Sequence, residues 1–106
     1  MDPFDFVIVS SFTLENALQA GLLVKVFENR WPELSGGKPI VMTAAIAGAF
    51  SLAAIREVWN EFVLWRKDIM PTLPEEEQMF VTQMNEQTIW VIEDAVAFTI
   101  LRPEDY

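Results

Sequence analysis

The chain has 106 residues, a length that fits one domain, and its 16 acidic and 7 basic residues give a formal net charge of −9. The lack of cysteine and histidine excludes disulfides, thiolate chemistry, zinc clusters and imidazole acid–base catalysis. The negative charge makes direct binding to a nucleic-acid backbone unfavourable. Hydrophobic residues make up 52% of the chain, which favours a folded protein over the disorder that is common in acidic chains.

The N-terminal part predicts a helix over residues 3–30. Asp2 and Pro3 form a helix-start signal, and apolar residues recur at helical spacing as far as Val26. A competing interpretation is a strand over residues 6–9, followed by a helix that starts near Thr13.

A linker is expected over residues 31–39. Trp31 precedes Pro32, and proline disfavours the helical conformation of the residue before it. Gly36 and Gly37 then give the backbone flexibility, and Pro39 restarts the next element.

The most apolar stretch covers residues 40–55 and reads IVMTAAIAGAFSLAAI, with Lys38 and Arg56 as the nearest charges on either side. We expect it to be the first half of a helix over residues 40–69 whose second half is amphipathic. The run falls just short of the about 20 apolar residues that a membrane-spanning helix needs. A transmembrane helix and a buried, alanine-rich core helix both remain open.

Two sets of side chains in this predicted helix are candidates for contacts with other helices or with an interface. The small residues expected to form a helix-packing face are Ala44, Ala45, Gly48 and Ala49. The aromatic residues expected at a membrane or protein interface are Trp59, Phe62 and Trp65.

After a break at residues 70–73, Pro74 and the three acidic residues behind it form a helix-start signal and predict a helix over residues 74–101. The alternative is a β-hairpin. Residues 88–92 and 96–101 are rich in β-branched and aromatic residues, and Glu93 with Asp94 could turn between them. Residues 102–106 form an acidic tail.

These elements predict an all-α domain over residues 1–106, with three long helices in an up-down-up bundle and a central helix that could cross a membrane. The alternative is an α+β fold with a C-terminal β-hairpin. No catalytic residue, cofactor, metal or small-molecule substrate is expected, because the carboxylates lack a histidine, a cysteine or another fixed nucleophile beside them.

The main functional hypothesis is a non-enzymatic helical subunit that is embedded in or associated with a membrane and acts by packing within a larger assembly. An accessory subunit of a membrane complex and a structural protein of a lipid-containing virion both fit, with protein subunits and membrane lipid as partners. The alternative is a soluble, cytoplasmic, acidic protein-binding module or inhibitor that engages a basic partner surface.

Overall fold

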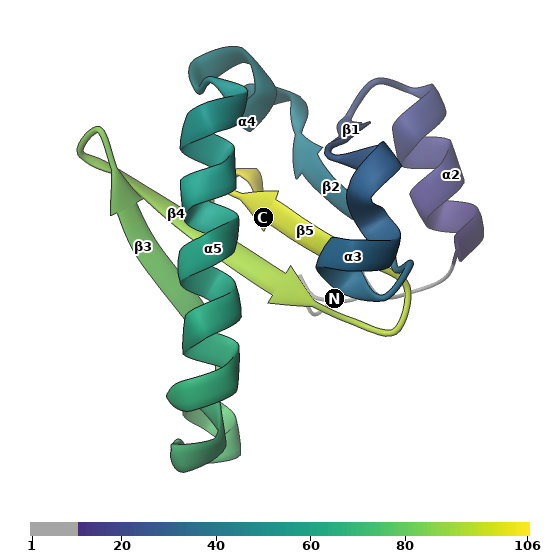
Figure 1. Cartoon of the computed structure of the whole chain (residues 1–106). Coiled ribbons are helices and arrows are strands. Elements are labelled where there is room, and N and C mark those ends of the chain that lie inside the picture. The colour runs from purple at the N-terminus through teal and green to yellow at the C-terminus, as the bar shows by residue number, and fades with distance from the viewer. Residues whose placement is uncertain (1–10) are drawn as a thin grey trace.

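A computed structural model describes residues 11–106 and has an α+β fold in which one long helix lies across a mixed sheet (Figure 1). The helices are α2 (Ser11–Gln19), α3 (Trp31–Ser35), α4 (Ala44–Ala49) and α5 (Leu52–Asp68). The strands are β1 (Leu23–Lys25), β2 (Ile40–Thr43), β3 (Phe80–Met84), β4 (Gln87–Glu93) and β5 (Phe98–Leu101). Short 3-10 helices are η1 (Glu28–Arg30), η2 (Met70–Thr72), η3 (Glu75–Glu77) and η4 (Pro103–Asp105). The predicted all-α bundle is therefore wrong, and the α+β alternative fits.

Within residues 11–106 the sheet has five strands, in the order β1-β2-β5-β4-β3. β2 and β5 are parallel, while the β1–β2, β5–β4 and β4–β3 pairs are antiparallel. This order places β1 and β3 at the two edges. The central strands β2 and β5 come from opposite halves of the sequence, so the sheet depends on a long-range pairing.

The predicted helix over residues 3–30 is confirmed for Ser11–Gln19 and is wrong for the residues after it, because α2 ends at Gln19 and β1 follows. Gly21 has a φ of 77°, a left-handed conformation that glycine adopts without strain and that commonly ends helices. The N–H of Leu22 then donates to the carbonyl of Ala17 over 2.9 Å, which closes the end of the helix. The alternative strand over residues 6–9 lies outside the described residues.

The predicted linker over residues 31–39 is also more ordered than expected. Trp31 begins α3, with Pro32 in the first helical turn, where the missing N–H has no cost. The indole N–H of Trp31 donates to the carbonyl of Val26 over 2.8 Å. This bond ties α3 to the segment that follows β1.

The predicted helix over residues 40–69 is wrong in its first half, because the apolar run is divided among β2, α4 and the start of α5. Its opening residues are Ile, Val, Met and Thr, and three of these four are β-branched, which favours a strand. The hydroxyl of Thr43 then accepts from the N–H of Ile46 and caps α4, and Ser51 caps α5 in the same way through Ala54. Phe50 between the two helices is extended.

No helix within residues 11–106 combines the length and the apolar character needed to cross a membrane. The prediction that the central helix could cross a membrane is therefore wrong.

The predicted helix over residues 74–101 is wrong, and the hairpin alternative is right for β4 and β5. These strands pair in an antiparallel register that places Glu93 opposite Phe98. β3 precedes them and joins β4 through the two residues Asn85 and Glu86, which have φ values of 52° and 67°. Two consecutive residues with positive φ form the tight turn whose twist matches that of paired strands.

The main core lies between α5 and one face of the sheet. Five aromatic side chains join the helix to β3 and β5, with ring centroids 5.1–6.1 Å apart: Trp59, Phe62, Trp65, Phe80 and Phe98. A smaller cluster on the other face packs Ala17 of α2 against Leu23 and Val41. α5 is therefore fixed over β3, β4 and β5, which determines what surrounds the β3 edge.

Candidate protein-interaction surface

β3 lies at an edge of the sheet, with no further strand beside it among residues 11–106. It pairs with β4 over five consecutive residues, and nothing in the described part of the chain is hydrogen-bonded to the backbone of its outer side. Its sequence, FVTQM, contains no proline and no charge. Proline and charged residues within an edge strand are two of the devices by which proteins usually prevent it from pairing with another chain.

Carboxylates surround this edge. We call these six exposed residues the acidic flank: Glu57, Glu61, Glu75, Glu76, Glu77 and Glu86. Two lie on α5, three form η3 directly before β3, and one lies in the turn directly after it. The hydroxyl of Thr82 in β3 donates to Glu61 over 3.3 Å, which shows how close α5 brings its carboxylates to the strand.

None of the six carboxylates forms an ion pair with the described residues. The sequence has no lysine or arginine from residue 68 to residue 101. The carboxylates also do not converge into a group that could hold a metal ion, within the described chain. Their negative charge is therefore left uncompensated by this part of the protein.

Most of the positive charge lies on the other side of α5, facing α3. Lys38, Arg66 and Lys67 line a pocket of about 430 Å³ there, and Arg56 lines a neighbouring pocket of about 390 Å³. The remaining cations pair locally, as Lys25 does with Glu28 over 3.1 Å. Among residues 11–106, the unpaired carboxylates of the acidic flank and most of the cations therefore lie on different sides of α5.

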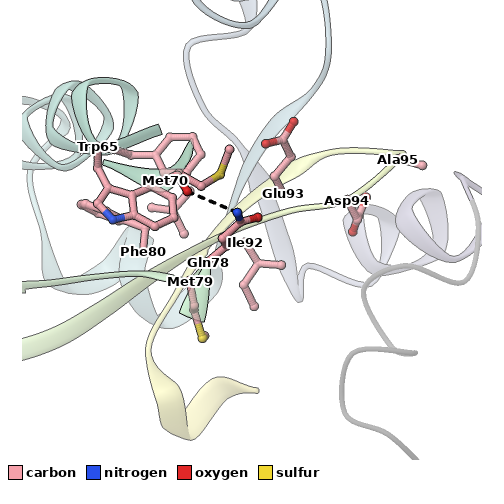
Figure 2. Close-up of a pocket in the computed structure, with 11 residues that line it drawn as sticks. Trp65, Met70, Gln78, Met79, Phe80, Ile92, Glu93, Asp94 and Ala95 are labelled. Atoms are coloured by element: carbon pink, nitrogen blue, oxygen red, sulfur yellow. Dashed lines mark hydrogen bonds between the residues drawn. The ribbon is translucent and has the colours of Figure 1, made fainter. Parts of the chain in front are cut away.

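The largest of these hollows, about 630 Å³, lies between the C-terminal end of α5 and the turn between β4 and β5 (Figure 2). Trp65 and Phe80 form its apolar part, and Gln78 donates to the carbonyl of Met70 over 3.2 Å at its side. Two carboxylates, those of Glu93 and Asp94, belong to its lining.

Both carboxylates of this pocket already have structural partners. Glu93 accepts two hydrogen bonds from Arg66, at 2.7 and 2.8 Å, and lies 3.7 Å from the ammonium of Lys38. Asp94 Oδ1 accepts from the backbone N–H groups of Val96 and Ala97, at 2.6 and 2.9 Å. The Glu93 contacts hold α5 beside β4, and the Asp94 contacts shape the turn between β4 and β5.

The Arg66–Glu93 contact predicts a pH dependence of stability. Its hydrogen bonds lower the pKa of the Glu93 carboxyl, partial burial opposes this, and the charges of Arg66 and Lys38 lower it further. A lowered pKa in the folded state gives stability that is present above the ordinary pKa and is lost as the pH falls through the lowered value. We expect Glu93→Gln to flatten part of the decline in unfolding free energy between about pH 7 and about pH 3.

The measurement is urea denaturation across this pH range. Glu104→Gln is the matched control, because Glu104 is exposed and forms no ion pair with the described residues. An unchanged pH profile for Glu93→Gln would show that the contact does not contribute to stability.

The two sets of side chains that were expected to form contacts, the small residues and the aromatic residues, lie on different helices, α4 and α5. Ala44, Gly48 and Ala49 are exposed on α4 and Ala45 is partly buried, so this short helix does not carry them into the core. Of the aromatic residues, Trp59 and Phe62 are buried in the main core. Trp65 is partly buried and lines the pocket of about 630 Å³.

The sequence interpretation missed the surface that the fold assembles. In the sequence, the triplet Glu75–Glu77 indicates the start of a helix, and Glu57 and Glu61 fit the polar side of an amphipathic one. One signal in the sequence could have indicated the turn that follows the edge strand: Asn85 comes directly after residues 80–84, and asparagine is suited to a tight turn between two strands.

Comparison with protein-family models, with curated proteins and with solved structures gives no match for this chain.

Proposed function

We propose that this protein is a protein-binding module whose acidic flank engages a positively charged surface of another protein. The observation that carries the proposal is the gathering of six exposed carboxylates around one sheet edge without a cation among them. A basic partner surface would supply the opposite charges that these carboxylates lack among residues 11–106. Complementary charge also speeds association and selects between partners.

The use of the other carboxylates supports a binding role over a catalytic one. Glu93 is held by Arg66 and Lys38, and Asp94 by two backbone N–H groups. Acid–base catalysis requires such groups to face a substrate with suitably placed partners. The acidic flank, by contrast, is exposed and faces outward, as a binding surface must.

The test uses octalysine as a basic probe and a triple variant, Glu57→Gln, Glu61→Gln and Glu86→Gln. The variant is expected to bind octalysine about tenfold more weakly than the wild type, because each exposed charge pair contributes up to about 1 kcal/mol. Raising the ionic strength from about 0.05 M to about 0.5 M should weaken the wild-type affinity and narrow this difference.

The control is the triple variant Glu15→Gln, Glu28→Gln and Glu104→Gln, which changes the net charge equally, lies on α2, η1 and η4, and breaks one exposed ion pair, that of Glu28 with Lys25. Isothermal titration calorimetry measures all three proteins. Equal weakening by the two triple variants would show that net charge, and not the acidic flank, attracts the probe. Unfolding curves of the two triple variants check that the substitutions leave the fold intact.

A further inference from the structure

We propose that the partner binds as an extended segment that adds a strand to the free edge of β3. This inference rests on the proposed function and deepens it, because it specifies the form and the sequence pattern of the basic partner. Strand addition obtains its affinity from main-chain hydrogen bonds and its specificity from alternate side chains.

The backbone of β3 is suited to this pairing. Its register with β4 is continuous from Phe80 opposite Val91 to Met84 opposite Gln87, without a bulge. The N–H and C=O groups of every second residue of β3 therefore point away from β4, towards the open edge. β1, the other edge strand, is only three residues long and ends at a lysine.

The side chains around the edge define the pattern of the added strand. Thr82 lies on the α5 side of the sheet, where it contacts Glu61. Val81 points to the opposite face and is 50% exposed. An added strand that alternates basic with β-branched apolar residues would place its cations beside the carboxylates of α5 and its apolar side chains beside Val81.

A second copy of this chain does not fit the same edge. Pairing two β3 strands would bring two acidic flanks together, and like charges opposite one another destabilise a sheet. The flank thus protects the edge against self-pairing while it leaves the edge available to a basic segment.

The experiment uses an octapeptide in which lysine and valine alternate. Two further versions carry main-chain N-methyl groups, one on every lysine and the other on every valine. In a strand, all lysine N–H groups point to one side and all valine N–H groups to the other. We expect one methylated version to bind at least about tenfold more weakly than the parent and the other to bind nearly as well.

Amide hydrogen exchange supplies a second readout on the protein itself. The parent octapeptide should slow exchange at alternate amides of β3, by about tenfold or more when the site is saturated, and leave β1 unchanged. Equal affinity of both methylated versions and the parent, without new protection in β3, would overturn strand addition.

These outcomes separate the two proposals. If strand addition alone fails, the octapeptide still binds and still loses affinity in the triple variant of Glu57, Glu61 and Glu86. If the proposed function fails, that variant binds the octapeptide as well as the wild type does. Concentration-dependent protection of β3 without peptide would indicate self-pairing and would also overturn the inference.

Discussion

Replacing Trp59 with alanine is expected to lower the free energy of unfolding by about 3–5 kcal/mol, the usual cost of removing a large aromatic side chain from a core. Trp59 is 2% exposed and lies at the centre of the contact between α5 and the sheet. Its ring meets Phe98 edge to face at 5.1 Å and lies 5.3 Å from Phe62. The substitution would leave a cavity between helix and sheet and remove these aromatic contacts.

Leu64→Ala is the matched control on the same helix. Leu64 is 61% exposed, so its truncation should change the unfolding free energy by less than about 0.5 kcal/mol. Urea denaturation measures both variants. A small effect of Trp59→Ala, or a similar effect of the two substitutions, would contradict a core built on the buried face of α5.

Replacing Asp94 with alanine is expected to cost about 2–3 kcal/mol, because hydrogen bonds to charged groups are among the stronger ones in proteins. Asp94 Oδ1 receives the N–H groups of Val96 and Ala97, and the N–H of Asp94 itself donates to the carbonyl of Ala97 over 3.1 Å. These bonds shape the turn that brings β5 back beside β4. Alanine would leave two backbone donors without their acceptor.

Asp94→Asn keeps an oxygen acceptor at the same place and should cost only about 1 kcal/mol. Thermal or urea unfolding of the two variants gives the comparison. If asparagine and alanine destabilise the protein equally, the loss comes from the charge and not from the hydrogen bonds of the turn.

The sequence allowed the C-terminal hairpin to be predicted only as an alternative. The β-branched and aromatic residues of β4 and β5 are a local signal, and Glu93 and Asp94 between them end β4 and shape the turn. The helical interpretation was preferred because Pro74 and three glutamates resemble a helix start. In the structure these glutamates form only the 3-10 helix η3.

The prediction of a continuous helix over the apolar run of residues 40–55 is wrong for a different reason. β2 is stabilised by pairing with β1 on one side and β5 on the other, and such long-range contacts are invisible to local periodicity. Two local signals do lie within the run, Thr43 and Ser51. Both are good N-cap residues, and they divide the run into a strand and two helices.

The candidate surface was even less accessible to sequence reasoning. The acidic character of the chain was evident, and so was the hypothesis of a basic partner. The acidic flank, however, combines Glu57 and Glu61 of α5 with residues that lie around β3, far along the chain. Only the packing of α5 over β3, through Phe62 and Phe80, brings them to one edge.

The most direct measurement of the central claim, that the acidic flank is the binding surface, is an NMR titration of the amide resonances with octalysine. The account predicts shifts centred on residues 57–61 and 75–86, which fade as salt is added. Shifts centred instead on the side of α5 that faces α3, around Lys38, Arg66 and Lys67, would contradict it, as would shifts spread evenly over the molecule.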